Sequence, residues 1–235
     1  MTAFLPAKAT PMSVAKTLQA IPLFSQLADD ELARLAQVAR ERKYPKSSMI
    51  LFEDDPGDAL YVVLSGRVKV VLVGEDGREV ILSILSDGDF FGEMSLIDDE
   101  PRSAHVIAME SSRLLVLRRH DFQMCLEETP RIAVSLLKGL TKRLRMADSK
   151  IGGLVLLDVA GRIARVLLEL ADDHDGVMIA RKMTHNMIAQ MIGSSRETVS
   201  RTMRTLVEQR VVSVSGKNIT VLDRKALKAA AGLFR

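Results

Sequence analysis

Hydrophobic residues change their spacing along the chain, and the changes separate a strand-rich region from helical ones. Between residues 49 and 117, short runs of Val, Ile and Leu alternate with glycine turns, a pattern typical of a β-barrel or double-sheet roll. The Asp76-Gly77 pair between two such runs predicts a hairpin. Residues 13–42 instead carry apolar positions at helical spacing, and this spacing returns from Asp121 onward. The pattern predicts an α+β protein.

A long helix is predicted to begin at Pro130, after which apolar residues recur in alternating steps of three and four. The apolar stripe that this heptad spacing produces is narrower than the stripe of an ordinary surface helix. It predicts that two copies of the chain pair along this helix; the alternative is that the stripe packs against the core of its own chain. The predicted dimer seam consists of Leu137, Leu140, Leu144, Ala147, Ile151 and Leu154.

Two short helices joined by a glycine turn are predicted between Thr184 and Gln209. Thr184 and Ser195 suit the N-caps of the two helices, and Gly193 suits the turn between them, so the segment reads as a helix-turn-helix. A hairpin with Gly216-Lys217 at its tip follows and resembles the wing of a winged helix. The inner face of the helix pair is predicted to bury Ile188, Met191, Ile192, Val199 and Leu206.

The second of these helices presents chemistry suited to reading DNA bases. Arg196 and Arg201 can donate to the O6 and N7 acceptors of guanine, and Glu197 can accept from the N4 amine of cytosine. A face that bound only phosphate would not contain Glu197, so base reading is favoured over a solvated charged face, which is the alternative. The expected DNA-backbone contacts are Thr184, Ser195, Ser200 and Lys217.

The segment "FGEMSLIDDEPRSA", residues 91–104, interrupts the strand-like region with polar residues. Gly92 and Glu93 can begin a short helix, and Arg102 can bind a phosphate. Glu93 can accept a hydrogen bond from a sugar hydroxyl, and the Ser103 hydroxyl can donate a hydrogen bond. Together these residues predict a cup for a ribose joined to a phosphate. A structural Glu93–Arg102 salt bridge explains the same residues equally well.

Composition excludes several other classes of protein. A single cysteine, Cys125, excludes an intrachain disulfide, a Cys-rich zinc site and a four-Cys cluster. The four histidines are dispersed, and the sequence contains no P-loop or nucleophile elbow, so neither catalytic residues nor a metal are expected. The net charge of +3 is compatible with nucleic acid. With no long apolar run and no secretory signal, we expect a cytoplasmic protein that does not contact a membrane.

Taken together, these motifs resemble the cyclic-AMP receptor protein family and its fumarate–nitrate-regulator relatives (Crp/Fnr). Residues 91–104 resemble the phosphate-binding cassette of cyclic-nucleotide domains, and "IGSSRETVSRTMRTLVEQ" resembles the recognition helix. The resemblance implies a loose N-terminal tail over residues 1–12, a cyclic-nucleotide-binding β-roll (a double-sheet jelly roll) over 13–129, a dimerisation helix over 130–157 and a winged helix-turn-helix over 158–235.

The resemblance also implies how such a protein works. A cyclic nucleotide bound between the roll and the dimer helix would allosterically control a homodimeric transcription regulator, with a hinge at Leu157 and Asp158. The base contacts Arg196, Glu197 and Arg201 imply palindromic double-stranded DNA with TGTGA-like half-sites. RNA polymerase is an implied partner, although the loop at residues 172–176, which relatives use for that contact, looks short.

The sequence departs from cyclic-AMP-binding relatives at the position that meets the nucleotide base. Those relatives carry Thr followed by Ser or Asn on the dimer helix, where this chain has Ala147 and Asp148. A carboxylate only accepts, and it can pair with both N1–H and N2–H of guanine. Cyclic AMP is therefore the first candidate effector, with cyclic GMP or cyclic di-GMP as rivals; a ligand-independent or haem-sensing relative is a further alternative.

Overall fold

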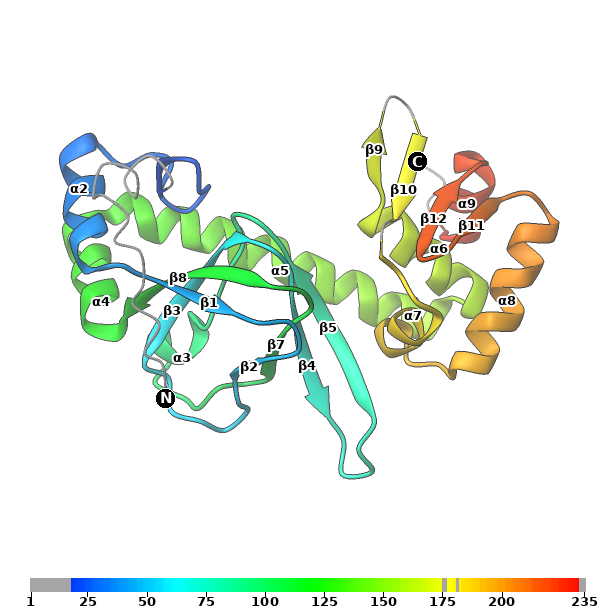
Figure 1. The fold of residues 1–235 in the computed structure, drawn as a ribbon, viewed down its shortest axis with the longest axis horizontal. Coiled ribbons are helices and arrows are strands. Elements are labelled where there is room, and N and C mark those ends of the chain that lie inside the picture. The colour runs from blue at the N-terminus through cyan, green and yellow to red at the C-terminus, as the bar shows by residue number, and fades with distance from the viewer. Residues whose placement is uncertain (1–17, 175–176, 181, 233–235) are drawn as a thin grey trace. The chain divides into compact units, whose positions relative to one another are not determined.

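The computed structural model describes residues 18–174, 177–180 and 182–232. The chain divides into two compact units, residues 1–72 with 82–142 and residues 73–81 with 143–235 (Figure 1). In chain order, residues 18–156 contain α2 (Asp29–Val38), β1 (Arg40–Tyr44), β2 (Met49–Leu51), β3 (Ala59–Ser65), β4 (Val68–Val73), β5 (Glu79–Leu85), β6 (Phe90–Phe91), α3 (Met94–Ile97), β7 (His105–Ala108), β8 (Ser112–Arg118), α4 (Arg119–Glu128) and α5 (Pro130–Leu156).

The strands form two antiparallel sheets, which confirms the predicted roll. One sheet has the order β1-β8-β3-β6 and the other β2-β7-β4-β5. The Asp76-Gly77 turn joins β4 to β5 as predicted. In this turn Gly77 adopts φ +76°, and the Asp76 carboxylate accepts a hydrogen bond from the Arg78 amide at 3.0 Å.

The central strands β3 and β8 bury both of their faces. Successive side chains of a strand point to opposite sides, so Tyr61 and Val63 enter the core between the two sheets while Leu60 and Val62 enter a second core. That second core is formed with α2, α4 and the beginning of α5. The near-continuous apolar runs of these strands follow from this double burial.

The helix predicted for residues 13–42 is wrong in its extent. Among the described residues, α2 covers only Asp29–Val38, and its first turn is acidic, as the helix dipole favours. Residues from Arg40 onward instead form β1, which pairs with β8 from Arg40 opposite Val116 to Tyr44 opposite Ser112. Tertiary pairing overrides the local helical spacing there. The predicted tail at residues 1–12 lies outside the described part of the chain.

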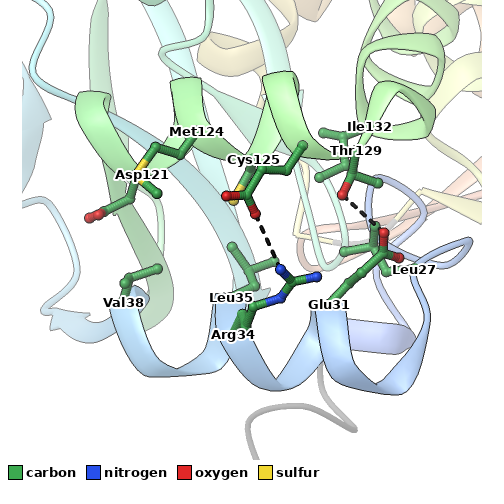
Figure 2. Close-up of a pocket in the computed structure, with 11 residues that line it drawn as sticks. Leu27, Glu31, Arg34, Leu35, Val38, Asp121, Met124, Cys125, Thr129 and Ile132 are labelled. Carbon is green, nitrogen blue, oxygen red and sulfur yellow. Dashed lines mark hydrogen bonds and ion pairs between the residues drawn. The ribbon is translucent and has the colours of Figure 1, made fainter.

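A hollow of about 160 Å³ lies between α2 and α4 on the helical side of the roll (Figure 2). Arg34 reaches Glu128 at 3.5 Å and the Thr129 hydroxyl donates to Glu31 at 3.1 Å across it. Cys125 lines the hollow, and burial raises the pKa of its thiol to about 11. No residue of the 91–104 segment contributes to this hollow, so it is separate from the predicted nucleotide cup.

Helix α5 is one continuous helix of 27 residues, about 40 Å long at the usual rise per residue. Four residues of the predicted seam are more than half exposed within the single chain: Leu137, Leu144, Ile151 and Leu154. Ala147 is also exposed. Leu140 differs because it is partly buried and packs against the core of its own β-roll.

The second part of the chain is a winged helix-turn-helix, as predicted. Its four-stranded sheet has the order β11-β12-β10-β9, and the wing is the β11–β12 hairpin. The predicted inner face of the helix pair is buried throughout, from Ile188 to Leu206. The elements are α6 (Val159–Leu170), β9 (Asp172–His174), β10 (Val177–Ala180), α7 (His185–Ile192), α8 (Arg196–Glu208), β11 (Val212–Ser215), β12 (Asn218–Val221) and α9 (Arg224–Ala230).

Candidate nucleotide and DNA sites

Gly92 forms the turn that leads from β6 into α3, at the start of the predicted cup. Its φ of +82° is strained for any residue with a side chain. A Cβ at this position would lie 2.7 Å from Arg102 Nη1 and 3.0 Å from the Ala59 carbonyl oxygen. Glycine therefore allows the backbone to approach the guanidinium of Arg102 closely.

Arg102 is 3% exposed, and its guanidinium is fixed by three acceptors. Nη1 donates to the Gly92 carbonyl at 2.7 Å, while Nη2 donates to the Ala59 carbonyl at 2.9 Å and pairs with the Asp58 carboxylate at 3.1 Å. Its backbone is held too, because Arg102 N donates to Asp55 O and Arg102 O accepts from Asp54 N, both at 2.9 Å. The side chain is thus pre-positioned by contacts that do not involve a ligand.

Glu93 and Ser103 flank this arginine in different environments. Glu93 occupies the N-cap position of the short helix α3 and is 2% exposed. Ser103 is exposed, and its hydroxyl lies 3.8 Å from Met94 Sδ. A carboxylate accepts hydrogen bonds, and a hydroxyl can also donate one. The structure joins the Gly92 carbonyl directly to Arg102 by a hydrogen bond.

Three groups that sequence reasoning missed contact this segment from outside residues 91–104. Asp58 lies in the loop before β3, the Ala59 carbonyl belongs to the first residue of β3, and Arg119 is the first residue of α4. These residues lie far from residues 91–104 along the chain, so no sequence spacing predicts the contact. The glycine at Gly57 was the only local feature that indicated a turn in this loop.

Tyr61 lies on β3 beside the cassette, where its ring stacks on Phe91 with 5.1 Å between centroids. Burial, and secondarily the Asp58 carboxylate, raises the pKa of the Tyr61 phenol above its usual value. The phenol is therefore neutral at physiological pH.

Ala147 and Asp148 lie on exposed positions of α5, within its second half. Ser149, the next residue, accepts from Arg165 through its carbonyl at 2.6 Å and its hydroxyl at 3.2 Å. Arg165 lies on α6 and also donates to the Ala231 carbonyl at 3.2 Å. The turn of α5 that carries Asp148 is thereby linked by one side chain to the first helix of the DNA-binding domain.

The predicted hinge corresponds to a two-residue break between helices. Helix α5 ends at Leu156, and Asp158 caps α6 by accepting from the Gly161 amide at 2.8 Å. Leu157 still donates to the Gly153 carbonyl at 3.1 Å, so the hydrogen bonds of α5 extend to the first residue of this break.

Helices α7 and α8 begin with the caps that the sequence predicted. The Thr184 hydroxyl accepts from Met187 N at 3.2 Å, and the Ser195 hydroxyl accepts from Thr198 N at 3.1 Å. Gly193 adopts φ +62° in the turn between them. The Ser195 hydroxyl also donates its own O–H, to Thr198 Oγ1 at 3.0 Å.

The outward face of α8 is polar along its first two turns. Arg196, Glu197 and Arg201 are exposed, and Ser200 is partly exposed. Lys217 is exposed at the tip of the wing. The arginines and the acid therefore lie on one accessible helix face, as reading bases in a major groove requires.

Neither a metal-binding cluster nor a membrane-spanning helix is found among the described residues. No group of three or more His, Cys, Asp or Glu side chains is placed there to hold a metal ion. Within residues 18–174, 177–180 and 182–232, no helix has both the length and the apolar character needed to cross a bilayer.

Two sequence families match the chain at these sites. The cyclic nucleotide-binding domain family matches residues 41–129, which include the cassette, and the Crp-like helix-turn-helix domain family matches residues 161–230. The cassette and helices α7 and α8 thus each lie in a domain of the corresponding kind.

Whole-chain similarity extends across both domains. The chain is 35% identical to the cyclic AMP receptor protein of Thermus thermophilus over 210 residues, covering 89% of this chain and 96% of that protein. It is 36% identical to the cAMP-activated global transcriptional regulator CRP of Salmonella typhimurium over 184 residues, covering 76% and 88%. The solved structure of the c-di-GMP responsive global regulator CLP of Xanthomonas campestris aligns with a TM-score of 0.72 at 26% identity, covering 83% and 99%.

Proposed function

This chain belongs to the Crp/Fnr family of transcription regulators, and on that premise we propose that it is a homodimer controlled allosterically by a cyclic nucleotide. The proposal rests on Arg102, whose buried guanidinium donates a hydrogen bond to the Gly92 carbonyl. The same chain also carries the capped helix α8. Arg102 and Ser103 bind the cyclic phosphate, Gly92 allows close approach of the backbone, and Glu93 accepts a ribose hydroxyl.

Cyclic AMP is the first candidate effector. The relatives from Thermus thermophilus and Salmonella typhimurium are named for cyclic AMP, and they cover most of this chain at 35% and 36% identity. Calorimetric titration with cyclic AMP, cyclic GMP and cyclic di-GMP tests the assignment. Binding of cyclic AMP alone supports it, and absence of heat for all three ligands contradicts the nucleotide-controlled function.

A guanine nucleotide is the second candidate, favoured by the carboxylate of Asp148 at an exposed position of α5. Asp148 pairs with the N1–H and N2–H edge of guanine in this reading, and the similar CLP regulator is named as c-di-GMP responsive. Asp148→Thr is expected to shift preference from guanine to adenine nucleotides. Unchanged preference in a chain that binds cyclic GMP or cyclic di-GMP contradicts this role.

DNA is the proposed macromolecular partner, read by the exposed face of α8. Arg196 and Arg201 bind guanine and Glu197 binds cytosine, giving TGTGA-like half-sites in an inverted repeat. The sugar–phosphate backbone is held by Thr184, Ser195, Ser200 and Lys217. Selection of binding sites from random duplexes tests this assignment: a palindrome with these half-sites supports it, and indifference to sequence contradicts it.

The dimer forms through the exposed stripe of α5, in which Leu137, Leu144, Ile151 and Leu154 are more than half exposed. Nucleotide binding shifts the relative placement of the two DNA-binding domains through the break at Leu157 and Asp158. RNA polymerase is the further partner of such a regulator. Its predicted contact loop falls partly on β9, and Asp175 and Gly176 lie outside the described residues. A DNA-binding regulator of this kind acts in the cytoplasm.

A further inference from the structure

Arg119, the first residue of α4, ties together three segments around the cassette. Its Nε and Nη2 donate to the Gly57 carbonyl at 3.1 and 2.8 Å, and Nη2 also donates to the Ser95 carbonyl at 2.7 Å. Its Nη1 pairs with the Asp99 carboxylate. One guanidinium thus joins the loop before β3, helix α3 and the turn that follows α3.

The loop before β3 lies directly against α3 where Arg119 binds both. A Cβ on Gly57 would lie 2.3 Å from the Cβ of Ser95, so only glycine permits this approach. The backbone of Arg119 adds a further link, because its N–H donates to the Asp58 carbonyl at 2.8 Å. Asp58 is the residue whose carboxylate pairs with Arg102.

Helix α3 is too short to hold its own position. It has four residues, a single turn, and an isolated turn is unstable because nucleation costs more than one hydrogen bond returns. Its placement therefore depends on tertiary contacts, and Arg119 supplies one charge-assisted hydrogen bond to the Ser95 carbonyl of this helix. Glu93 occupies the N-cap of this same helix.

We propose that Arg119 is a positioning residue for the ribose end of the nucleotide site. By holding α3 against the loop at Gly57 and Asp58, it fixes the place of the Glu93 carboxylate relative to Arg102. Arg119 itself does not contact the nucleotide. The inference rests on the proposed function, in which Glu93 accepts a ribose hydroxyl.

The test compares two ligands that differ only in that hydroxyl, cyclic AMP and 2′-deoxy-cyclic AMP, using the full-length protein. The wild-type protein is expected to bind the deoxy ligand more weakly, because Glu93 loses its donor. Arg119→Ala is expected to weaken cyclic AMP binding about tenfold and to reduce the penalty for the missing hydroxyl to about twofold, since coupled groups act non-additively. If the wild-type protein binds cyclic GMP instead, cyclic GMP and its 2′-deoxy form replace this pair.

Arg118→Ala is the matched control, because Arg118 is the neighbouring arginine and its side chain is exposed. It is expected to bind both ligands as the wild type does. Thermal unfolding checks that each variant is folded. If Arg119→Ala does not fold, Arg119→Lys keeps the charge but not the planar fork of donors, and a reduced hydroxyl penalty is expected there too.

The outcomes separate this inference from the proposed function. If the wild-type protein binds a cyclic nucleotide but the hydroxyl penalty is absent, or is the same in the folded Arg119 variant, the positioning role is overturned while the regulator remains nucleotide-controlled. If the wild-type protein binds none of cyclic AMP, cyclic GMP and cyclic di-GMP, the proposed function fails and the inference fails with it.

Discussion

The cassette and the recognition helix both present arginines, but the two sites are built differently. Arg102 is 3% exposed and is fixed by the Gly92 carbonyl and by two groups far away in sequence, Ala59 and Asp58. Arg196 and Arg201 are exposed on one helix that its own Ser195 caps. A guanidinium fixed before binding loses little conformational entropy when a ligand arrives, whereas exposed arginines must be ordered by the DNA.

This difference predicts how each site fails. Changes at the cassette are expected to act through several segments at once, because one buried side chain holds them together. Changes on α8 are expected to act on one base position each, because the exposed side chains of a helix share few contacts. The variants below test that contrast, from the largest expected effect to the smallest.

Arg102→Ala is expected to have the largest effect, weakening cyclic-nucleotide binding roughly 100-fold or more, as removal of one partner from a buried charged contact does. The same change leaves the Asp58 carboxylate and two carbonyls without their donor. Calorimetry measures the affinity, and sedimentation measures the dimer, which is expected to persist. Arg42→Ala, an exposed arginine of β1, serves as the control. An affinity equal to that of the wild type would remove Arg102 from the site.

Arg196→Ala is expected to weaken binding to the preferred DNA roughly 10- to 100-fold, the value of one bidentate contact to guanine, and to leave nucleotide affinity unchanged. Competition binding against duplexes altered at single positions measures both affinity and preference. Arg204→Ala, on the same face of α8, provides the comparison. If Arg196→Ala lowers affinity equally for every duplex, Arg196 binds phosphate rather than a base.

Glu197→Ala is expected to relax the preference at one position of each half-site and to change overall affinity only a few-fold. Loss of the carboxylate removes an acceptor for cytosine but also removes repulsion from nearby phosphates, so the two effects oppose each other. Selection of binding sites with the variant and the wild type gives the measurement. An unaltered consensus sequence would rule out base reading by Glu197.

Ser195→Ala is expected to lower the free energy of unfolding of the DNA-binding domain by about 1 kcal/mol, since it removes the side-chain cap of α8. Thermal denaturation of the full-length protein measures the change. Ser213→Ala, in the wing strand β11, is a suitable serine control. Nucleotide affinity is expected to stay at the wild-type value, and a parallel loss there would show that the two sites are not built independently.

Cys125 is expected to give the smallest effect. Burial raises the pKa of its thiol to about 11, so little thiolate exists at neutral pH and alkylation is slow. Cys125→Ser is expected to change nucleotide and DNA affinities less than about twofold, because the residue lines the hollow between α2 and α4 rather than either site. Rapid alkylation in the native protein would contradict the burial of this thiol.

The sequence by itself predicted the features that depend on neighbouring residues. The Asp76-Gly77 hairpin, the caps at Thr184 and Ser195, and the buried face of α7 and α8 all follow from local spacing and cap chemistry. The separation of a strand-rich region from helical ones followed as well, because strand and helix periods change sharply along the chain.

Only the tertiary structure decided the features that depend on distant segments. It ended α2 at Val38 and made the next residues a strand, because β8 offers them a partner. It turned Leu140 toward the core of its own roll, and it brought Asp58 and Arg119 to the cassette. Sequence spacing records which residues share one helix or strand face, whereas contacts between elements are set by packing, and packing exists only once the chain has folded.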